Sequence, residues 1–314
     1  MMLSGRPLLD IRVDAEMFVD RDDERHRLAT AVTHGYNTLM WGEAGIGKTS
    51  LVRTFAYELR TSGRTVHYAR AEGASRADEL LRGVAATLPG DRGKAAGADV
   101  ESLLRELGRD AERRVIILDD VSSAAGYQLF GLFRDQLWAL PWTWIVAVRT
   151  EEKGGLLRAP ATAFFERVIE LGPLPPGAAV DMIRRRNGKR APRWARQVAT
   201  AAGGNPRRVL AVARDITENG GDADAVVGSL GRRTAAIQAL GRPESMLAAE
   251  LEALGAASAS DEALLDRLGW TRARAAQVFA TLESAGLVTS DEVRSGTGRP
   301  RRVFRLTPAA HWAT

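Results

Sequence analysis

The sequence predicts an α/β fold class: a parallel five-stranded core, a helical segment behind it, and a small C-terminal domain of helices and a hairpin. Short apolar runs alternate with amphipathic stretches through the first half of the chain, which is typical of a parallel sheet covered on both faces. A glycine-rich turn follows the first of these runs, and a pair of aspartates ends a later one. From about residue 245 onward, helical periodicity replaces the alternation.

The segment NTLMWGEAGIGKTSLVRTFAYEL predicts a strand over 38–41, a loop, and a helix that begins near Lys48. The spacing Gly-x4-Gly-Lys-Thr is that of a phosphate loop, because glycines let the backbone N–H groups converge and the helix dipole favours the same anion. We expect ATP phosphates to bind Gly42, Glu43, Ala44, Gly45, Ile46, Gly47, Lys48, Thr49 and Ser50. Lys48 would reach the β- and γ-phosphates, and the Thr49 hydroxyl would bind Mg²⁺.

A buried strand over 115–118 ends in Asp119 and Asp120. Because ligands gather at the carboxyl ends of parallel strands, we expect Asp119 to hold Mg²⁺ and Asp120 to lie beside the γ-phosphate. The alternative is an aspartate pair that only caps a turn.

Three further strands are expected around 66–69, 143–148 and 168–171, with helices between them. The segment 89–98, PGDRGKAAGA, interrupts the pattern and predicts a loop.

With both phosphate-site motifs in place, residues 16–215 resemble the AAA+ ATPases, close to their origin-recognition and replication-licensing branch and to the neighbouring STAND signalling ATPases. FVDRDDERHRL is similar to the family's motif ahead of the core, although Asp20 replaces its usual glycine. The resemblance implies that Val19 and Arg21 lie on the adenine side of the nucleotide.

The same resemblance assigns three arginines. Arg149, at the end of IVAVR, matches sensor 1, where STAND members often have arginine. Arg167, just before the fifth strand, matches the finger that reaches a neighbouring subunit, or is a surface arginine; the finger implies a homo-oligomer. Arg207 matches sensor 2 in a helix capped by Asn205, with Arg208 or a solvated arginine pair as alternatives.

One departure concerns catalysis. Hydrolysing members of the family follow the Mg²⁺ aspartate with glutamate, whereas Asp120 is one methylene shorter. We therefore expect an ATPase that is slow, or one that DNA or oligomerisation stimulates.

Beyond a connector rich in glycine, three helices are expected, the second capped by Ser260 and the third by Thr271. Ala275, Val278, Phe279 and Leu282 form one apolar stripe on the third. With the arginine-rich segment GRPRRVFRLTP behind it, this region resembles a winged helix-turn-helix domain. We expect a core over 1–173, a helical lid over 174–230, a linker over 231–243 and the winged helix over 244–314.

The resemblance places the third helix in the major groove of double-stranded DNA and the hairpin along its backbone. The base-edge candidates are Arg272, Arg274 and Gln277, and the backbone candidates are Arg294, Arg299, Arg301 and Arg302. No acidic residue follows Glu292, so the formal net charge of +5 lies in this basic end. The same domain could instead dock a protein partner.

Composition bounds the remaining classes. The 314 residues, 45% of them hydrophobic and 26% charged, suit a soluble protein of two or three domains. There are no cysteines, and the four histidines have no metal-ligand spacing. No apolar run suits a membrane span or a signal peptide, so we expect a cytoplasmic location.

The sequence therefore favours an initiator- or loader-like AAA+ ATPase whose nucleotide state controls oligomerisation and DNA binding. One alternative is a STAND-like, ATP-switched transcriptional regulator. Another is an ATPase that remodels a protein partner.

Overall fold

The computed structural model describes residue 8 and residues 14–89, 99–109, 112–188, 191–218, 222–293 and 301–307. The chain divides into two compact units. Unit 1 comprises Met1–Ala191 with Gly204–Arg207, and unit 2 comprises Pro192–Gly203 with Arg208–Thr314.

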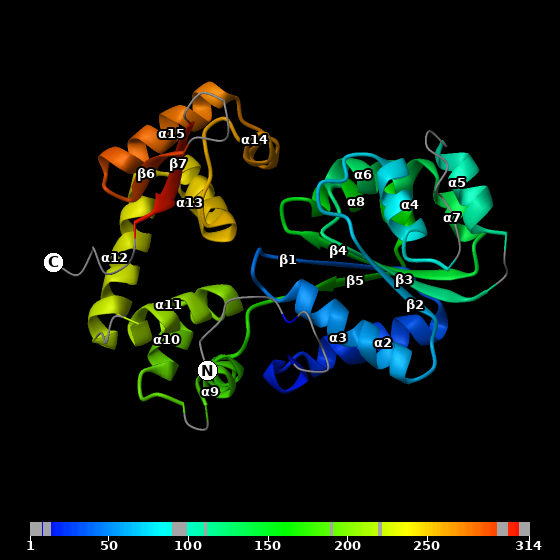
Figure 1. The fold of residues 1–314 in the computed structure, drawn as a ribbon, viewed down its shortest axis with the longest axis horizontal. Helices are drawn as coiled ribbons and strands as arrows, with labels where there is room; N and C mark the ends of the chain where they lie inside the picture. The colour runs from blue at the N-terminus through cyan, green and yellow to red at the C-terminus, as the bar shows by residue number, and fades with distance from the viewer. Residues whose placement is uncertain are drawn as a thin grey trace. The chain divides into compact units, whose positions relative to one another are not determined.

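Unit 1 alternates between helices and strands (Figure 1). Its strands are β1 (Thr38–Gly42), β2 (Val66–Arg70), β3 (Arg114–Asp119), β4 (Trp142–Arg149) and β5 (Arg167–Glu170). Its helical elements are η1 (Ala15–Met17), α2 (Asp22–His34), α3 (Lys48–Thr61), α4 (Ala77–Ala85), α5 (Val100–Leu107), α6 (Ser123–Tyr127), the π-helix η2 (Gln128–Leu132), α7 (Arg134–Trp138), α8 (Lys153–Leu156), η3 (Ala161–Phe164) and α9 (Pro176–Asn187).

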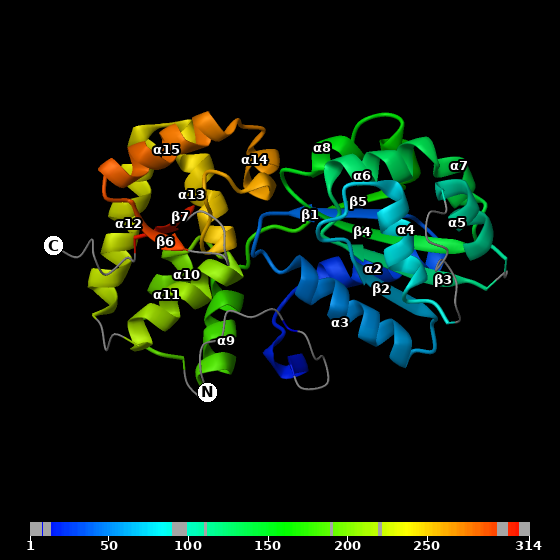
Figure 2. The same cartoon turned by 45° about the horizontal axis from the view of Figure 1, so that its top comes forward.

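The five strands form one parallel sheet in the order β2-β3-β4-β1-β5. Successive side chains of a strand point to opposite faces, so the sheet has a core on each side. Met40 and Ile117 pack under α2 and α3, whereas Leu39 and Trp144 pack with the helices from α4 to α8. Figure 2 shows these helices on the two faces of the sheet. The predicted parallel five-stranded core is confirmed.

Unit 2 is built from helices and one antiparallel strand pair. Its elements are α10 (Ala195–Ala201), the greater part of α11 (Pro206–Glu218), α12 (Ala223–Leu240), α13 (Arg242–Leu254), α14 (Glu262–Leu268), α15 (Arg272–Ser284), β6 (Val288–Val293) and β7 (Arg301–Leu306). Ala257 forms an isolated bridge to Phe304 of β7, and the Phe304 ring stacks on Phe279 of α15 with centroids 4.2 Å apart. The predicted apolar stripe of α15 is buried against these residues.

The residues of the predicted linker, 231–243, are helical, because α12 continues to Leu240 and α13 begins at Arg242. Glycines at 228 and 231 suggest a connector, since each costs about 1 kcal/mol in a helix. Val226, Leu230 and Ile237 are nevertheless buried, and α12 packs against α10 and α13. Burial of that apolar face outweighs the local propensity.

The two predicted caps of the C-terminal helices have different outcomes. Thr271 caps α15 by accepting a hydrogen bond from the Arg274 N–H. At α14 the capping position is Asp261, one residue after the predicted Ser260.

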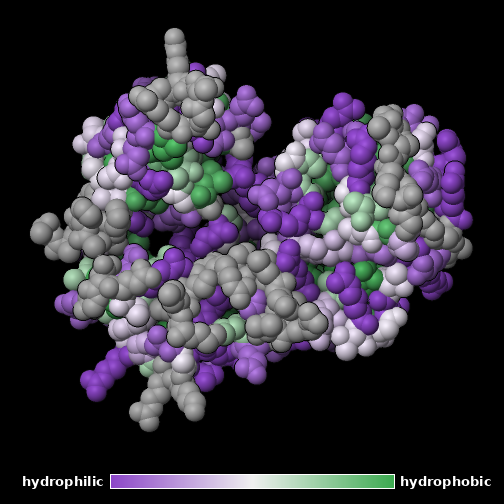
Figure 3. Space-filling model, viewed as in Figure 1, coloured by the Kyte–Doolittle hydropathy of each residue, from purple (hydrophilic) through white to green (hydrophobic). Residues whose placement is uncertain are grey.

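Where residues are coloured, the face in Figure 3 is mainly hydrophilic, with smaller hydrophobic areas between the hydrophilic ones. Within the described part of the chain, no helix is both long and apolar enough to cross a membrane.

Candidate nucleotide-binding site

The loop between β1 and α3 has the backbone that a phosphate loop requires. Gly45 and Gly47 have φ of 80° and 106°, a region that residues with side chains rarely adopt. At Gly42, an added Cβ would lie 2.7 Å from the Leu171 carbonyl oxygen. The loop ends at the first turn of α3, whose free N–H groups favour an anion.

Lys48 lies against this loop with only 8% of its surface exposed. Its Nζ donates to the carbonyl oxygens of Gly42, at 2.7 Å, and Glu43, at 2.9 Å. Burial lowers the pKa of the ammonium group to about 8, although the carboxylates of Asp120 and Asp119 oppose that shift. A buried cation that faces the loop favours binding of a polyanion there.

Asp119, the last residue of β3, is 1% exposed. Its side chain accepts hydrogen bonds from Thr49 and from the Tyr68 hydroxyl, the latter at 2.8 Å to Oδ2. Burial raises the pKa of the Asp119 carboxyl, and these two hydrogen bonds oppose the rise. The structure therefore brings together Thr49 and Asp119, the two predicted Mg²⁺ ligands.

Asp120 has φ of 65°, and its carboxylate turns toward the end of β4. There it accepts a hydrogen bond from Arg149 Nε at 3.0 Å, and both side chains are partly buried. The two residues predicted to act at the γ-phosphate are thus an ion pair in this structure.

The start of α11 closes over the loop. Asn205, 2% exposed, caps the helix by accepting from the Arg207 N–H at 3.1 Å, as predicted, and its Nδ2 also donates to the Ala44 carbonyl at 3.0 Å. A Cβ on Gly45 would lie 2.6 Å from Arg207 Cβ. Burial lowers the pKa of the Arg207 guanidinium; Arg149 lowers it further and Asp120 raises it, so these charges share one region.

The sequence analysis recognised Asn205 only as a cap. Its contact with the loop is a second role that the local pattern did not indicate. Tyr68 was missed altogether; the available signal was a polar group in the strand beside the predicted aspartate strand.

Arg21 has a structural role beside the loop. Its Nη2 donates to the carbonyl oxygens of Ile46, at 3.2 Å, and Gly172, at 2.7 Å, and its Nη1 pairs with Glu24 at 3.0 Å. Asp20 has φ of 58°, which explains the glycine that the resembling family has there. Val19 is buried, and adenine contact by Val19 and Arg21 stays a prediction.

Arg167 lies at the other end of the sheet. It is the first residue of β5, rather than just before it, and pairs with Thr38 at the start of β1, whereas the loop follows the end of β1. Its guanidinium lies over the Tyr36 ring, 4.8 Å from the centroid. A five-residue strand spans roughly 13 Å, so Arg167 is separated from the loop of its own chain.

The predicted DNA contacts have three outcomes. Arg272, Arg274 and Gln277 are exposed on α15, and Arg301 is exposed on β7. Arg302 pairs with Glu283 at 2.6 Å and Arg305 pairs with Asp291, so the hairpin is less basic than its arginines suggest. Arg294 and Arg299 lie outside the described residues.

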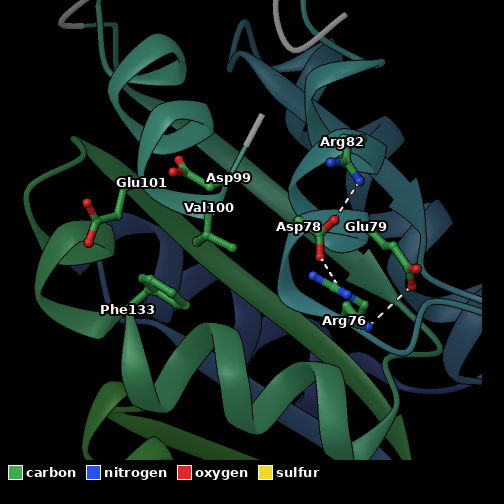
Figure 4. A pocket seen from close by; sticks show the side chains of 8 residues that line it. All are labelled: Arg76, Asp78, Glu79, Arg82, Asp99, Val100, Glu101 and Phe133. Carbon is green, nitrogen blue, oxygen red and sulfur yellow. Dashed lines mark hydrogen bonds and ion pairs between the residues drawn. The ribbon is translucent and has the colours of Figure 1, made fainter. Parts of the chain in front are cut away.

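A recess of about 580 Å³ lies beside α4 and α5 and includes none of the loop residues (Figure 4). Asp78 pairs with Arg76 and Arg82, and Glu79 accepts from the backbone N–H of Arg76. Asp78 is thus satisfied by the two arginines and Glu79 by a backbone N–H, so these side chains give no reason to expect a ligand.

Known proteins resemble this chain at two levels, in the sequence of the nucleotide-site region and in the fold. The sequence profile of a family described as an AAA domain matches residues 32–137, which include the loop and both aspartates. No curated protein matches the chain in sequence.

Two solved structures share the fold along nearly the whole chain. The ORC1 protein of Aeropyrum pernix, determined in complex with DNA, has 18% identity and a TM-score of 0.54 over 94% of this chain and 92% of that one. CDC6P of Pyrobaculum aerophilum has 14% identity and a TM-score of 0.52 over 96% of both. Unit 1 therefore has the α/β fold of a P-loop ATPase core.

Proposed function

We propose that this chain is an ATP-dependent, DNA-binding ATPase of the AAA+ initiator type. One observation carries the nucleotide part: Lys48, Asp119, Asp120, Arg149 and Arg207, from four separate segments, meet around one phosphate loop. Several cations beside two carboxylates suit a nucleotide triphosphate with its metal ion better than an isolated anion.

Each of these residues has a separate role at the bound ATP. The loop N–H groups and Lys48 hold the phosphates, and Asn205 and Arg21 hold the loop in shape. The oxygens of Thr49 and Asp119 suit Mg²⁺, a hard cation that takes oxygen ligands and supplies charge neutralisation on the phosphates. Asp120 orients the attacking water, and Arg149 and Arg207 face the γ-phosphate.

The Arg149–Asp120 ion pair favours slow hydrolysis, because Arg149 already engages one oxygen of the carboxylate that would orient the water. Arg167 is too far from its own loop to help, so it would act on a neighbouring copy. Turnover is therefore expected to rise with self-association.

The DNA part concerns unit 2. We infer that α13, α14, α15 and the β6–β7 hairpin form a winged helix-turn-helix, with α15 as the recognition helix. Exposed Arg272, Arg274 and Gln277 would reach base edges, and Arg301 would contact phosphate. The fold shared with an ORC1 protein that was determined with DNA supports this proposal.

A second candidate is favoured by the ion pairs of the hairpin. Arg302 and Arg305 are neutralised by Glu283 and Asp291, which suits a protein-docking surface better than a phosphate-binding one. In that case the ATPase would remodel a protein partner.

Anisotropy of a labelled DNA duplex distinguishes the two candidates, measured with ATP, ADP and no nucleotide at two salt concentrations. The DNA-binding proposal predicts affinity that depends on nucleotide and decreases steeply with salt, because each neutralised phosphate adds about 0.9 to the salt slope. Lys48→Ala should remove the nucleotide effect and leave basal DNA binding. Weak binding that no nucleotide changes would favour the docking candidate.

A further inference from the structure

Tyr68 reaches the phosphate site from a strand that carries no part of the two motifs. It is the middle residue of β2, and its Cα pairs with Ile117 of β3, two residues before Asp119. Paired residues and those two apart point to the same face of a sheet, so Tyr68 and Asp119 share a face. The Tyr68 side chain extends along the strand until its hydroxyl lies 2.8 Å from Asp119 Oδ2.

The Tyr68 side chain is held in this position from α3. Arg53 Nε donates to the Tyr68 hydroxyl oxygen at 3.1 Å, and the Arg53 guanidinium lies over the Tyr68 ring, 4.8 Å from its centroid. Arg53 is four residues after Thr49, one turn further along the same helix. The aromatic ring also packs against the core beneath α3.

The direction of the hydrogen bonds follows from their chemistry. A tyrosine hydroxyl has one proton and can also accept. Since Arg53 can only donate, it occupies an accepting position on the oxygen, and the hydroxyl proton is directed to Asp119. The relay from Arg53 through Tyr68 fixes one oxygen of the aspartate.

We propose that Tyr68 is a positioning residue that orients the Asp119 carboxylate for Mg²⁺-nucleotide, with Arg53 fixing Tyr68. Hydrogen-bonded partners of a metal-binding carboxylate typically change metal affinity by 10–100-fold when removed. The inference rests on the proposed nucleotide function. It adds β2, which carries neither motif, to the elements that form the nucleotide site.

The test is the affinity of a fluorescent ATP analogue, measured at one pH with Mg²⁺ and with EDTA. Tyr68→Phe removes only the hydroxyl, and we expect the gain in affinity due to Mg²⁺ to fall by about tenfold while affinity in EDTA stays within twofold. Arg53→Gln should lower the same gain by a smaller factor, because Tyr68 keeps its hydroxyl. Tyr57→Phe is the control. Tyr57 lies on α3, as Arg53 does, and is 41% exposed, so this variant should behave as wild type.

The outcomes separate the two proposals. If wild type binds the analogue, Lys48→Ala does not, and Tyr68→Phe keeps the full Mg²⁺ gain, the positioning role is overturned and the nucleotide function stands. Equal losses with and without Mg²⁺, or a lower melting temperature that accounts for the loss, would show a structural role only. If wild type does not bind, the nucleotide function fails and this inference fails with it.

Discussion

Arg149 donates a hydrogen bond from Nε to Asp120 Oδ1 across 3.0 Å, so the end of β4 is tied to the residue after β3 by charge. The sequence analysis placed Asp120 beside the γ-phosphate and matched Arg149 to sensor 1. Their ion pair means that a bound γ-phosphate competes with Asp120 for the Arg149 guanidinium.

Asp120→Asn should lower ATP hydrolysis by roughly 100-fold, because the amide cannot act as a base toward water. Nucleotide affinity should stay within about threefold, since Lys48 and the loop remain in place. Steady-state phosphate release and a binding titration measure the two quantities. Asp135→Asn, at an exposed aspartate of α7, is the control, and hydrolysis by Asp120→Asn at the wild-type rate would remove Asp120 from the mechanism.

Gly45→Ala should abolish nucleotide binding and destabilise unit 1. The added Cβ meets Arg207 Cβ at 2.6 Å, and φ there is +80°. Gly63→Ala is a matched control, because φ is +83° and nothing lies within 4 Å of the new Cβ. Strain alone costs about 1–2 kcal/mol, and the clash at Gly45 should add about 1–3 kcal/mol. Urea unfolding of both variants checks this, and equal losses would contradict the close contact with α11.

Asn205→Ala should lower both stability and nucleotide affinity, since it removes a helix cap and the hydrogen bond to the Ala44 carbonyl. The loss of the cap costs about 1 kcal/mol. Asp99→Ala removes the cap of α5 in the same unit, where the side chain accepts from the Ser102 N–H. It should lower stability alone. Similar nucleotide affinities for the two variants would count against a role for Asn205 in shaping the loop.

The stability of unit 1 should decrease as the pH falls below about 6.5. Burial lowers the pKa of His67, and nearby Arg114 and Arg60 lower it further, while its bond to the Thr87 carbonyl and the charge of Glu112 oppose the shift. Between the folded and the unfolded pKa values of His67, the unfolded chain binds more protons than the folded chain. The free energy of unfolding therefore decreases as the pH is lowered through that window.

Removing the imidazole tests this assignment. His67→Gln should reduce the decrease in stability, measured by chemical unfolding between pH 7.5 and 5. His26→Gln, at an exposed histidine of α2, should leave the pH dependence unchanged. Identical curves for all three proteins would mean that other groups cause any decrease.

Arg301→Ala should reduce the salt slope of duplex binding by about 0.9, whereas Arg302→Ala should reduce it by less. The difference follows from the ion pair of Arg302 with Glu283, which already neutralises that guanidinium. Anisotropy titrations at several salt concentrations measure both slopes. A larger loss for Arg302 would mean that the pair opens when DNA binds.

Unit 2 shows where local patterns mislead. The glycines of 228–231 predicted a connector, but Leu230 and Ile237 pack against other helices of unit 2, and a helix is formed. The arginine-rich hairpin predicted a strongly basic surface. Cross-strand and helix neighbours that no local pattern identifies, Asp291 and Glu283, neutralise part of it.

The sequence by itself determined the parallel core, the phosphate loop, the aspartate pair and the caps of α11 and α15. These features depend on backbone conformations and periodicities within a few residues, which neighbouring side chains dictate. Only the tertiary structure decided that Arg149 binds Asp120, that Arg21 and Asn205 hold the loop, and that Tyr68 reaches Asp119. Those contacts join segments far apart in the chain, and the register of the sheet sets their distances.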